Sequence, residues 1–154
     1  MDLSPDLIDA LAEFENFSVE YLVVGGWAVS THAKPRFTKD LDLWIGTAPA
    51  NLERAVRALA AFGAPRELLL EAARMTPDEF FFFGTPPARI DLLRSIPGVT
   101  FEEAWPRRAR ARWGTRTVNL IGLDDLITAK RAAGRPQDLL DLKLLLAVKQ
   151  RETP

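Results

Sequence analysis

Two aspartates at alternate positions of an apolar segment are the residues of this sequence best placed to do chemistry. Asp40 and Asp42 stand in the segment 39–45, where the positions between and after them are apolar. Side chains alternate across a β-strand, so both carboxylates project from one face while Leu41 and Leu43 face the other way. Two carboxylates on one face of a strand suit a shared metal ion.

A glycine pair precedes these aspartates. Gly25 and Gly26 follow the apolar run Tyr21 to Val24, which predicts a buried strand, and precede a predicted short helix from Trp27 to Ala33. Glycine lets the backbone approach a ligand closely, and a helix N-terminus offers free N–H groups to a phosphate. The two motifs together suggest one site, with phosphates at the glycines and their Mg²⁺ at the aspartates.

The order and spacing of the two motifs resemble the signature of the nucleotidyltransferase superfamily related to DNA polymerase beta. In that signature an apolar residue precedes Gly-Gly or Gly-Ser, and acidic residues follow on alternate positions of an apolar strand. The similarity is to the minimal members, to aminoglycoside and lincosamide nucleotidyltransferases, and to the abortive-infection (AbiEii-like) toxin nucleotidyltransferases. It implies an α+β fold in which helices flank a small mixed β-sheet and further helices follow at the C-terminus. Gly26 stands where many relatives have a serine whose hydroxyl binds the nucleotide phosphate.

The resemblance also implies a third carboxylate on a neighbouring strand. The segment 88–93 reads as a strand with one acidic residue, Asp91, between apolar neighbours, and a buried carboxylate without a partner is costly. By resemblance, Asp91 joins Asp40 and Asp42 as a catalytic and metal-binding residue, and the three carboxylates hold two Mg²⁺ ions. The alternative is that Asp91 pairs with Arg89 or Arg94 instead of a metal.

Basic residues near these motifs are candidates for phosphate contacts. Arg36 and Lys39 lie between the glycines and the aspartates. Lys130 and Asp141 match the downstream lysine and the Lys/Arg-Asp-x-x-Asp element of the abortive-infection relatives. A lysine on a helix is often only a solvated charge, and Asp138 and Asp141 could instead be helix-start charges that favour the helix dipole. The residues expected to contact the nucleotide are Gly25, Gly26, Arg36, Lys39 and Lys130.

Composition limits the class of protein. The chain has 154 residues, a formal charge of -1, a pI near 5.9, no cysteine and one histidine. Disulfides, thiolate catalysis and zinc sites of the Cys type are therefore excluded, and net charge gives no reason to expect a protein that coats a nucleic-acid duplex. No apolar stretch is long enough to span a bilayer, and the N-terminus lacks the features of a signal peptide, so we expect a cytoplasmic protein. The length predicts a single domain over 1–154, with a core to about residue 121 and a helical part over about 122–150.

Hydrophobic spacing and turn residues predict the other elements. Ser4 and Pro5 mark the start of a helix that ends near residue 16, and Gly63 ends a helix over 51–62. Asp124 is a plausible N-cap for a helix that ends at Gly134, and Pro136 begins the last helix. The segment 66–75 is predicted to be a short helix, with a strand and a turn as the alternative. The remaining predictions are strands at 79–84 and 88–93, a helix from 101 to about 108 that is interrupted or bent at Pro106, and a hairpin over 111–121.

Three functions remain open at this point. The protein could transfer a nucleoside monophosphate from an NTP to an RNA end or a protein hydroxyl, as toxin relatives do, beside a helical partner or antitoxin protein. It could instead modify a small molecule such as an antibiotic, or it could be a module of the same fold that binds nucleotide or a partner without turnover. The arginines at 107, 108, 110 and 112, which lie between Trp105 and Trp113, could grip an RNA backbone or form a solvated face.

Overall fold

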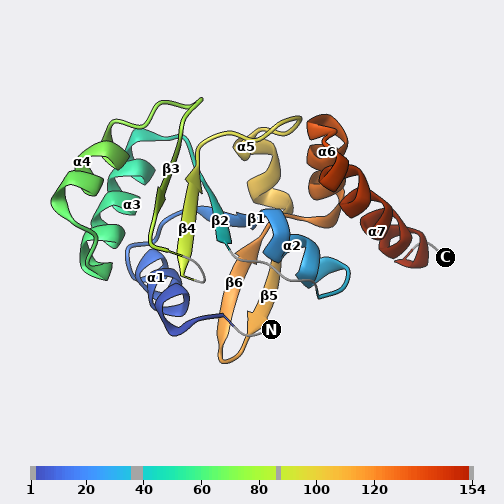
Figure 1. The fold of residues 1–154 in the computed structure, drawn as a ribbon, viewed down its shortest axis with the longest axis horizontal. Coiled ribbons are helices and arrows are strands. Elements are labelled where there is room, and N and C mark those ends of the chain that lie inside the picture. Colours follow the sequence, from blue (N-terminus) through green and yellow to red (C-terminus); the bar gives the residue numbers. More distant parts are fainter. Residues whose placement is uncertain (1–2, 36–39, 86–87, 153–154) are drawn as a thin grey trace.

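A mixed β-sheet separates two groups of helices (Figure 1). The structure is a computed structural model that describes residues 3–35, 40–85 and 88–152. Within these residues the sheet has six strands. Their order across the sheet is β3 (Phe80–Phe83), β4 (Arg89–Leu93), β2 (Asp40–Ile45), β1 (Tyr21–Val24), β6 (Arg116–Leu120) and β5 (Ala109–Trp113).

The central strands bring the predicted site residues side by side. β2 runs antiparallel to β1 and parallel to β4. In this register Asp42 lies opposite Val24 on one side and opposite Asp91 on the other. Residues that are opposite one another in neighbouring strands project from the same face of the sheet, so the carboxylates of Asp42 and Asp91 share a face.

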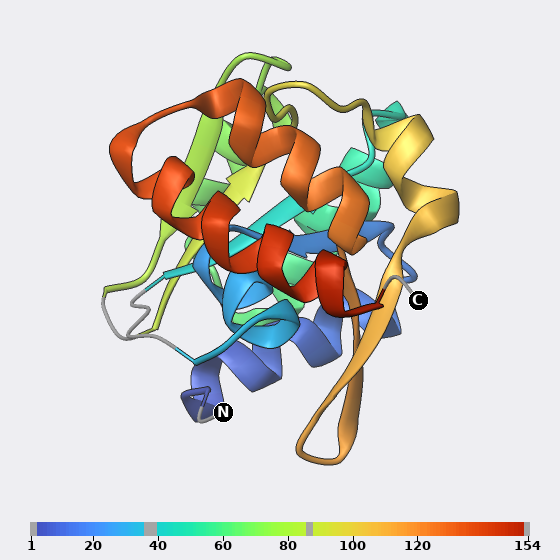
Figure 2. The same ribbon diagram turned by 90° about the vertical axis from the view of Figure 1, so that its right-hand side faces the viewer.

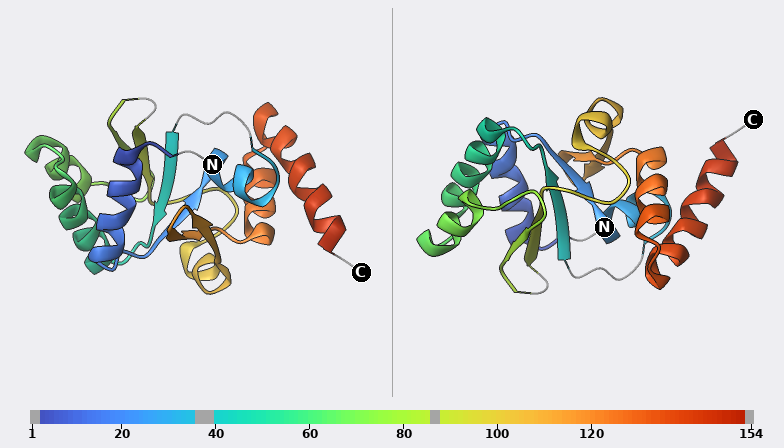
Figure 3. Two further views of the ribbon diagram at one scale, coloured as in Figure 1. Left: turned by 90° about the horizontal axis from the view of Figure 1, so that it is seen from below. Right: turned by 90° about the horizontal axis from the view of Figure 1, so that it is seen from above.

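Helices cover the sheet on both sides, as Figure 3 shows. One group consists of α1 (Pro5–Asn16), α3 (Pro49–Phe62) and α4 (Arg66–Ala73), and α3 contacts both of the others. The other group consists of α2 (Gly25–His32), α6 (Leu123–Ala133) and α7 (Pro136–Glu152), which contact one another, and α6 and α7 lie in front of α2 in Figure 2. A short helix α5 (Phe101–Ala104) and the 3-10 turn η1 (Trp105–Arg107) connect β4 to β5.

The alternation of β2 and β4 separates the core from the site. Leu41 and Leu43 on β2 and Ile90 and Leu92 on β4 are fully buried. Burial of each such side chain contributes about 1.5–3 kcal/mol, so the register of these strands is strongly determined. The residues between them, including Asp42, therefore face the opposite side of the sheet and are not part of the hydrophobic core.

Most predicted elements are confirmed, with three corrections. α2 begins at Gly25, two residues before the predicted start at Trp27. The predicted helix from residue 101 divides into α5 and η1, because Pro106 cannot donate the backbone hydrogen bond that would continue an α-helix. The N-cap of α6 is Gly122, and Asp124 lies inside the first turn, where its charge still favours the helix dipole.

The predicted division between a core and a helical C-terminal part coincides with the end of the sheet. β6 ends at Leu120 and α6 begins at Leu123. The organisation as a single domain stays a prediction. Within residues 3–35, 40–85 and 88–152, no helix combines the length and the apolar character needed to cross a bilayer.

Candidate active site

The three aspartates singled out by the sequence lie on one face of two adjacent strands. Asp42 and Asp91 are register partners, and their carboxyl groups are close enough to share a hydrogen bond. Asp40 stands two residues before Asp42 on the same face and is the register partner of Arg89. Parallel pairing of β2 with β4 thus assembles carboxylates that are about fifty residues apart in the chain.

Gly25 brings the backbone at the start of α2 against this cluster. Its φ is +67°, in the left-handed region that favours glycine. A Cβ atom added at this position would collide with the Oδ2 atom of Asp42. Val24, the N-cap residue of α2, has no polar side chain, and no side-chain cap hydrogen bond is present among the described residues, so the N-terminus of α2 is not capped by its own side chain. The backbone of the glycine turn and the carboxylate of Asp42 therefore form one continuous surface.

Burial and neighbouring negative charges raise the pKa of Asp42. Burial is the largest cause, followed by the charge of Asp91, a hydrogen bond with Asp91 and the charge of Asp40, and together they raise the pKa of Asp42 to about 7. The positive charge of Lys130 acts in the opposite direction. Strong perturbation of a carboxyl group beside a cavity is typical of functional sites. Among the described residues, the charges of Asp91 and Asp40 thus act on Asp42 more strongly than the charge of Lys130 does.

Arg89 brings a positive charge next to the carboxylates of Asp91 and Asp40. Its Nε atom lies 2.8 Å from Oδ1 of Asp91 and 3.8 Å from Oδ2 of Asp40. The side chains of Asp91 and Arg89 are 16% and 29% exposed, so this ion pair is partly shielded from water. Asp91 therefore pairs with Arg89, one of the two arginines expected as possible partners, whereas Arg94 donates to the carbonyl oxygens of Met75 and Thr47.

The cluster retains an unsatisfied oxygen despite this pairing. The Oδ1 atom of Asp40 is buried and has no hydrogen-bond partner among the described residues. With Arg89 between Asp40 and Asp91, no group of three or more histidine, aspartate or glutamate side chains in the described parts of the chain is arranged to hold a metal ion. A cation that replaced the guanidinium would meet carboxylate oxygens, one of which has no hydrogen-bond partner within residues 3–35, 40–85 and 88–152.

A cavity of about 480 Å³ opens beside Asp42. The strands contribute Val24, Asp42 and Leu93 to its wall, and Gly25 contributes the start of α2. The opposite wall comes from α6 and α7 and the turn between them, and includes the charged residues Lys130, Arg135 and Asp138. The cavity is therefore lined by three residues that the sequence predicted for the site, Gly25, Asp42 and Lys130. It is large enough for a small-molecule ligand.

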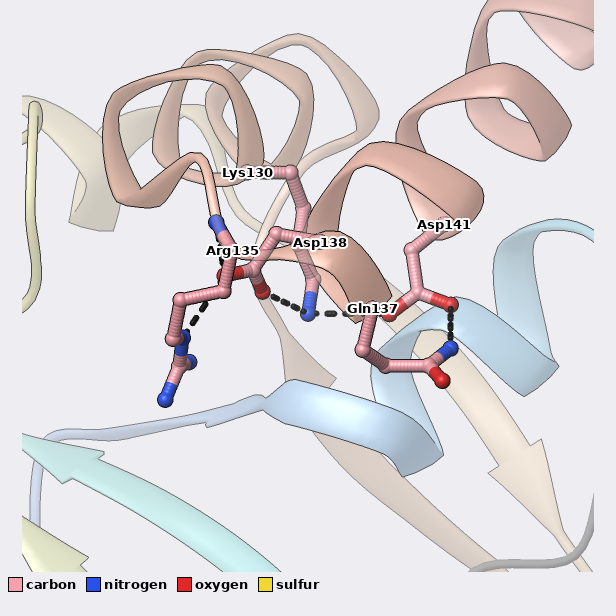
Figure 4. Close-up of polar contacts among 5 residues, drawn as sticks. All are labelled: Lys130, Arg135, Gln137, Asp138 and Asp141. Carbon is pink, nitrogen blue, oxygen red and sulfur yellow. Dashed lines mark hydrogen bonds and ion pairs between the residues drawn. The ribbon is translucent and has the colours of Figure 1, made fainter.

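Lys130 is held in place by two buried aspartates of α7 (Figure 4). Its Nζ atom lies 3.1 Å from Oδ1 of Asp138 and 3.0 Å from Oδ2 of Asp141. The lysine side chain is 12% exposed and those of the aspartates are 3% and 1% exposed, so the interpretation of Lys130 as a solvated charge is wrong. Gln137 donates to the other carboxylate oxygen of Asp141, at 3.0 Å.

Arg135 is a cavity residue that the sequence did not single out. Its backbone N–H and its Nε atom both donate to Oδ2 of Asp138, at 3.2 and 2.8 Å, and its side chain is 78% exposed (Figure 4). The hydrogen bond from the backbone satisfies a donor at the start of α7, so Asp138 does serve as a helix-start charge, as one interpretation predicted. The available signal was the spacing of three residues between Arg135 and Asp138 at a predicted helix start.

Two of the predicted phosphate contacts, Arg36 and Lys39, lie outside the described residues. Of the arginines near the C-terminal end of η1, Arg107 forms two hydrogen bonds with Asp125, and Arg108 stacks over the ring of Trp105 at 4.0 Å. These two side chains are thus already engaged within the protein.

Comparison with solved structures identifies the fold. The lincosamide antibiotic adenylyltransferase LnuA, in its lincomycin-bound structure, aligns over 96% of this chain and 99% of its own, with a TM-score of 0.63 and 15% identity. The enzyme ANT(2")-Ia, in complex with adenylyl-2"-tobramycin, aligns over 95% and 96%, with a TM-score of 0.60 and 14% identity. A protein from Thermotoga maritima that is assigned as a nucleotidyltransferase aligns over 95% and 96%, with a TM-score of 0.61 and 13% identity.

The chain has the nucleotidyltransferase fold. No protein-family model matches the sequence, and no curated protein matches it. The expectation of a small mixed sheet flanked by helices, with further helices at the C-terminus, is confirmed. Within this nucleotidyltransferase fold, Gly25, Asp42 and Lys130 line one cavity, and Asp40 and Asp91 share the sheet face of Asp42. Their chemical roles follow as a proposal.

Proposed function

We propose that the protein is a metal-dependent nucleotidyltransferase that transfers a nucleoside monophosphate from an NTP to a hydroxyl group. One observation supports this most directly: the carboxylate of Asp42 abuts the backbone of Gly25 on one side and shares a face with Asp91 on the other. A triphosphate at the glycine turn would then lie next to the carboxylates. Positioning and charge neutralisation supply most of the catalysis in such transfers.

The carboxylates fit Mg²⁺ by the chemistry of their donors. Mg²⁺ prefers carboxylate and phosphate oxygens, and the buried Oδ1 atom of Asp40 is an oxygen without a partner among the described residues. Asp40 and Asp42 would hold the ion that accompanies the triphosphate, and with Asp91 they would hold a second. Bound there, Mg²⁺ would neutralise the clustered carboxylates and the negative charge of the reacting phosphate.

Residues of the chain would bind the phosphates and accept the proton of the acceptor. The N–H groups at the start of α2 would bind phosphate oxygens, and Lys130, on the opposite wall of the cavity, would add a positive charge. The acceptor oxygen forms a bond to the α-phosphorus, while the bond from that phosphorus to the oxygen bridging to the β-phosphate breaks and pyrophosphate leaves. The proton of the acceptor hydroxyl would pass to the carboxylate of Asp91, once Arg89 has released it.

The likeness to two antibiotic adenylyltransferases favours a small-molecule acceptor. One of them was solved with lincomycin and the other with adenylylated tobramycin. An RNA or protein acceptor, a toxin role, an antitoxin partner and a cytoplasmic location stay predictions. The chemistry at the α-phosphorus is the same for every acceptor, so it can be tested before the acceptor is known.

The test is a transfer assay with each of the four α-labelled NTPs and Mg²⁺. Lincomycin, tobramycin, total RNA and total protein are supplied separately as acceptors. We expect label in one of these pools and release of pyrophosphate, and the variant Asp42→Asn should lose both while remaining folded. Transfer retained by Asp42→Asn, or the absence of NTP binding by calorimetry with the unaltered protein, would refute the proposal. Asp9→Asn, on the exposed surface of α1, is the matched control.

A further inference from the structure

The aromatic ring of Phe82 contacts the arginine that pairs with the aspartates of the candidate active site. Phe82 stands on β3 and is the register partner of Asp91 on β4, so both side chains project from the sheet face that carries the carboxylates. The guanidinium carbon of Arg89 lies 4.1 Å from the centroid of the Phe82 ring. This is the geometry of a cation–π contact, in which the face of the ring attracts a positive charge.

Arg89 therefore makes two kinds of attractive contact at the same time. Its Nε atom donates to Oδ1 of Asp91 at 2.8 Å and lies 3.8 Å from Oδ2 of Asp40, while its guanidinium group lies over Phe82. A long arginine side chain has many conformations, and a partly exposed ion pair loses much of its Coulomb gain because these conformations must be restricted. The contact with the ring restricts the same conformations and so favours the position beside the carboxylates.

Phe80, on the same strand, offers a comparison. Phe80 and Phe82 are 58% and 50% exposed, and their rings stack with centroids 6.4 Å apart. The register partner of Phe80 is the apolar Leu93, whereas that of Phe82 is Asp91. Phe80 thus matches Phe82 in exposure but stands two residues farther along the strand from the carboxylates. Substitutions at both positions leave the buried core unchanged, so Phe80 is a suitable control.

The position of the guanidinium matters because a metal ion needs the same oxygens. Mg²⁺ takes carboxylate oxygens in near-ideal octahedral geometry, and the proposed function assigns Asp40, Asp42 and Asp91 to it. Oδ1 of Asp91 accepts a hydrogen bond from Arg89, so a metal ion that binds this oxygen must displace the guanidinium. Every contact that holds the guanidinium in place, including that with Phe82, therefore lowers the affinity for the metal.

We propose that Phe82 is a positioning residue that holds the guanidinium of Arg89 beside the metal-binding carboxylates, and that the two residues form a latch on the metal site. Without a metal ion, Arg89 pairs with Asp91 and Asp40. A divalent ion brings twice the charge of the guanidinium and displaces it. The latch thus keeps the carboxylates paired until a divalent ion arrives, and it sets the affinity of the site. This inference rests on the proposed function, which places metal ions at the three aspartates.

The test measures binding of Mn²⁺, which prefers the same oxygen ligands as Mg²⁺, by electron paramagnetic resonance of the free ion. The titration is made without nucleotide at pH 8, above the pKa of about 7 of Asp42. Phe82→Leu should bind Mn²⁺ about threefold more tightly than the unaltered protein, because loss of the ring removes the cation–π contact. Phe82→Tyr keeps an aromatic ring and should bind like the unaltered protein. The control Phe80→Leu should also leave the affinity unchanged.

A double-mutant cycle shows whether Phe82 acts through Arg89. Arg89→Gln alone should tighten Mn²⁺ binding by about tenfold. When Phe82→Leu is added to Arg89→Gln, the affinity should not change further, because the ring then has no guanidinium to hold. Additive effects of the two substitutions would mean that the ring acts on the carboxylates without the arginine, and would overturn the inference.

Displacement of the guanidinium can be followed by NMR while Mg²⁺ is added. The side-chain Nε–H signal of Arg89 is identified by its loss in Arg89→Gln. We expect this signal to move during the titration, because the hydrogen bond to Asp91 is broken. The midpoint should lie at a lower Mg²⁺ concentration in Phe82→Leu than in the unaltered protein. A signal that stays in place while Mg²⁺ binds would overturn the inference.

Failure of this inference is distinguishable from failure of the proposed function. If Asp42→Asn abolishes transfer and Mn²⁺ binding while Phe82→Leu binds Mn²⁺ like the unaltered protein, the latch is absent and the proposed function stands. Weaker Mn²⁺ binding by Phe82→Leu would mean that the ring assists the metal, and would overturn the inference alone. If the unaltered protein binds neither Mn²⁺ nor Mg²⁺-ATP, both are overturned.

Discussion

The substitution Asp42→Asn should stabilise the metal-free protein at alkaline pH while it abolishes activity. The pKa of this carboxyl group is raised from 3.8 to about 7 in the folded state, first by burial and then by Asp91 and Asp40. A raised pKa means that the folded protein binds the proton more tightly than the unfolded chain does. The corresponding stability is present below pH 4 and is lost as the pH rises through 7.

The size of this effect follows from the shift. One pKa unit corresponds to 1.36 kcal/mol, so the full shift amounts to about 4 kcal/mol between acid and alkaline pH. This is a large part of the 5–15 kcal/mol that stabilises a typical domain. Asparagine has nearly the same shape as aspartate and no charge to desolvate, so the variant should not incur this loss. Its stability relative to the unaltered protein should therefore increase with pH.

The measurement is urea unfolding with EDTA at pH 5 and at pH 8.5. Only the part of the shift between pH 5 and the folded-state pKa of about 7 is lost in this range, so the unaltered protein should lose more stability than Asp42→Asn by roughly 3 kcal/mol. Added Mg²⁺ should stabilise the unaltered protein at pH 8.5 and have a much smaller effect on the variant. Asp9→Asn should behave like the unaltered protein throughout. Equal dependence of stability on pH in the unaltered protein and Asp42→Asn would show that burial and the neighbouring carboxylates do not raise the pKa of Asp42 as described.

Three further substitutions probe the turn, the lysine and the guanidinium of the site. Gly25→Ala should cost more than about 1 kcal/mol of stability and should abolish binding of Mg²⁺-ATP in calorimetry, because a Cβ there strains a positive φ and strikes a carboxylate. Its control is Gly114→Ala, since Gly114 has a similar φ of +65° but nothing within 4 Å of an added Cβ. Lys130→Met should cost about 3–5 kcal/mol in urea unfolding, because it leaves two aspartates of α7 buried without their cation. Lys149→Met, at an exposed ion pair, should cost much less. Arg89→Gln should tighten Mg²⁺ binding by about tenfold in calorimetry, because it removes a positive charge that competes for the same carboxylates.

Each of these predictions has an outcome that contradicts it. If Gly25→Ala and Gly114→Ala lose equal stability and both bind Mg²⁺-ATP normally, the glycine turn is only a connection between β1 and α2. A loss in Lys130→Met no larger than that in Lys149→Met would mean that the buried aspartates obtain their stabilisation elsewhere. Weaker Mg²⁺ binding by Arg89→Gln would mean that the guanidinium organises the carboxylates for the metal instead of competing with it.

The local elements were largely predictable because their signals lie within a few residues. Alternation of aspartate with leucine predicted β2 and the common face of Asp40 and Asp42, and this face is now observed. Gly63 and Gly134 were expected to end helices, and both occupy the left-handed conformation at a C-cap. The errors, at residues 25, 106 and 122, concern helix ends and a bend, where one or two hydrogen bonds decide the outcome.

What the sequence by itself determined is therefore the set of reactive groups and the faces from which they project, since strand and helix periods follow from local backbone geometry. Only the tertiary structure decided which of these groups meet. The parallel pairing of β2 with β4 placed Asp91 beside Asp42, and the packing of α6 and α7 brought Lys130 to the cavity and buried its aspartates. Asp42 is about fifty positions from Asp91 and about ninety from Lys130. Asp42 and Asp91 meet because burial of the opposite, apolar face of the sheet selects one register and one order of strands. The same packing left Phe80 and Phe82 exposed beside the carboxylates, where periodicity alone placed them only on a strand.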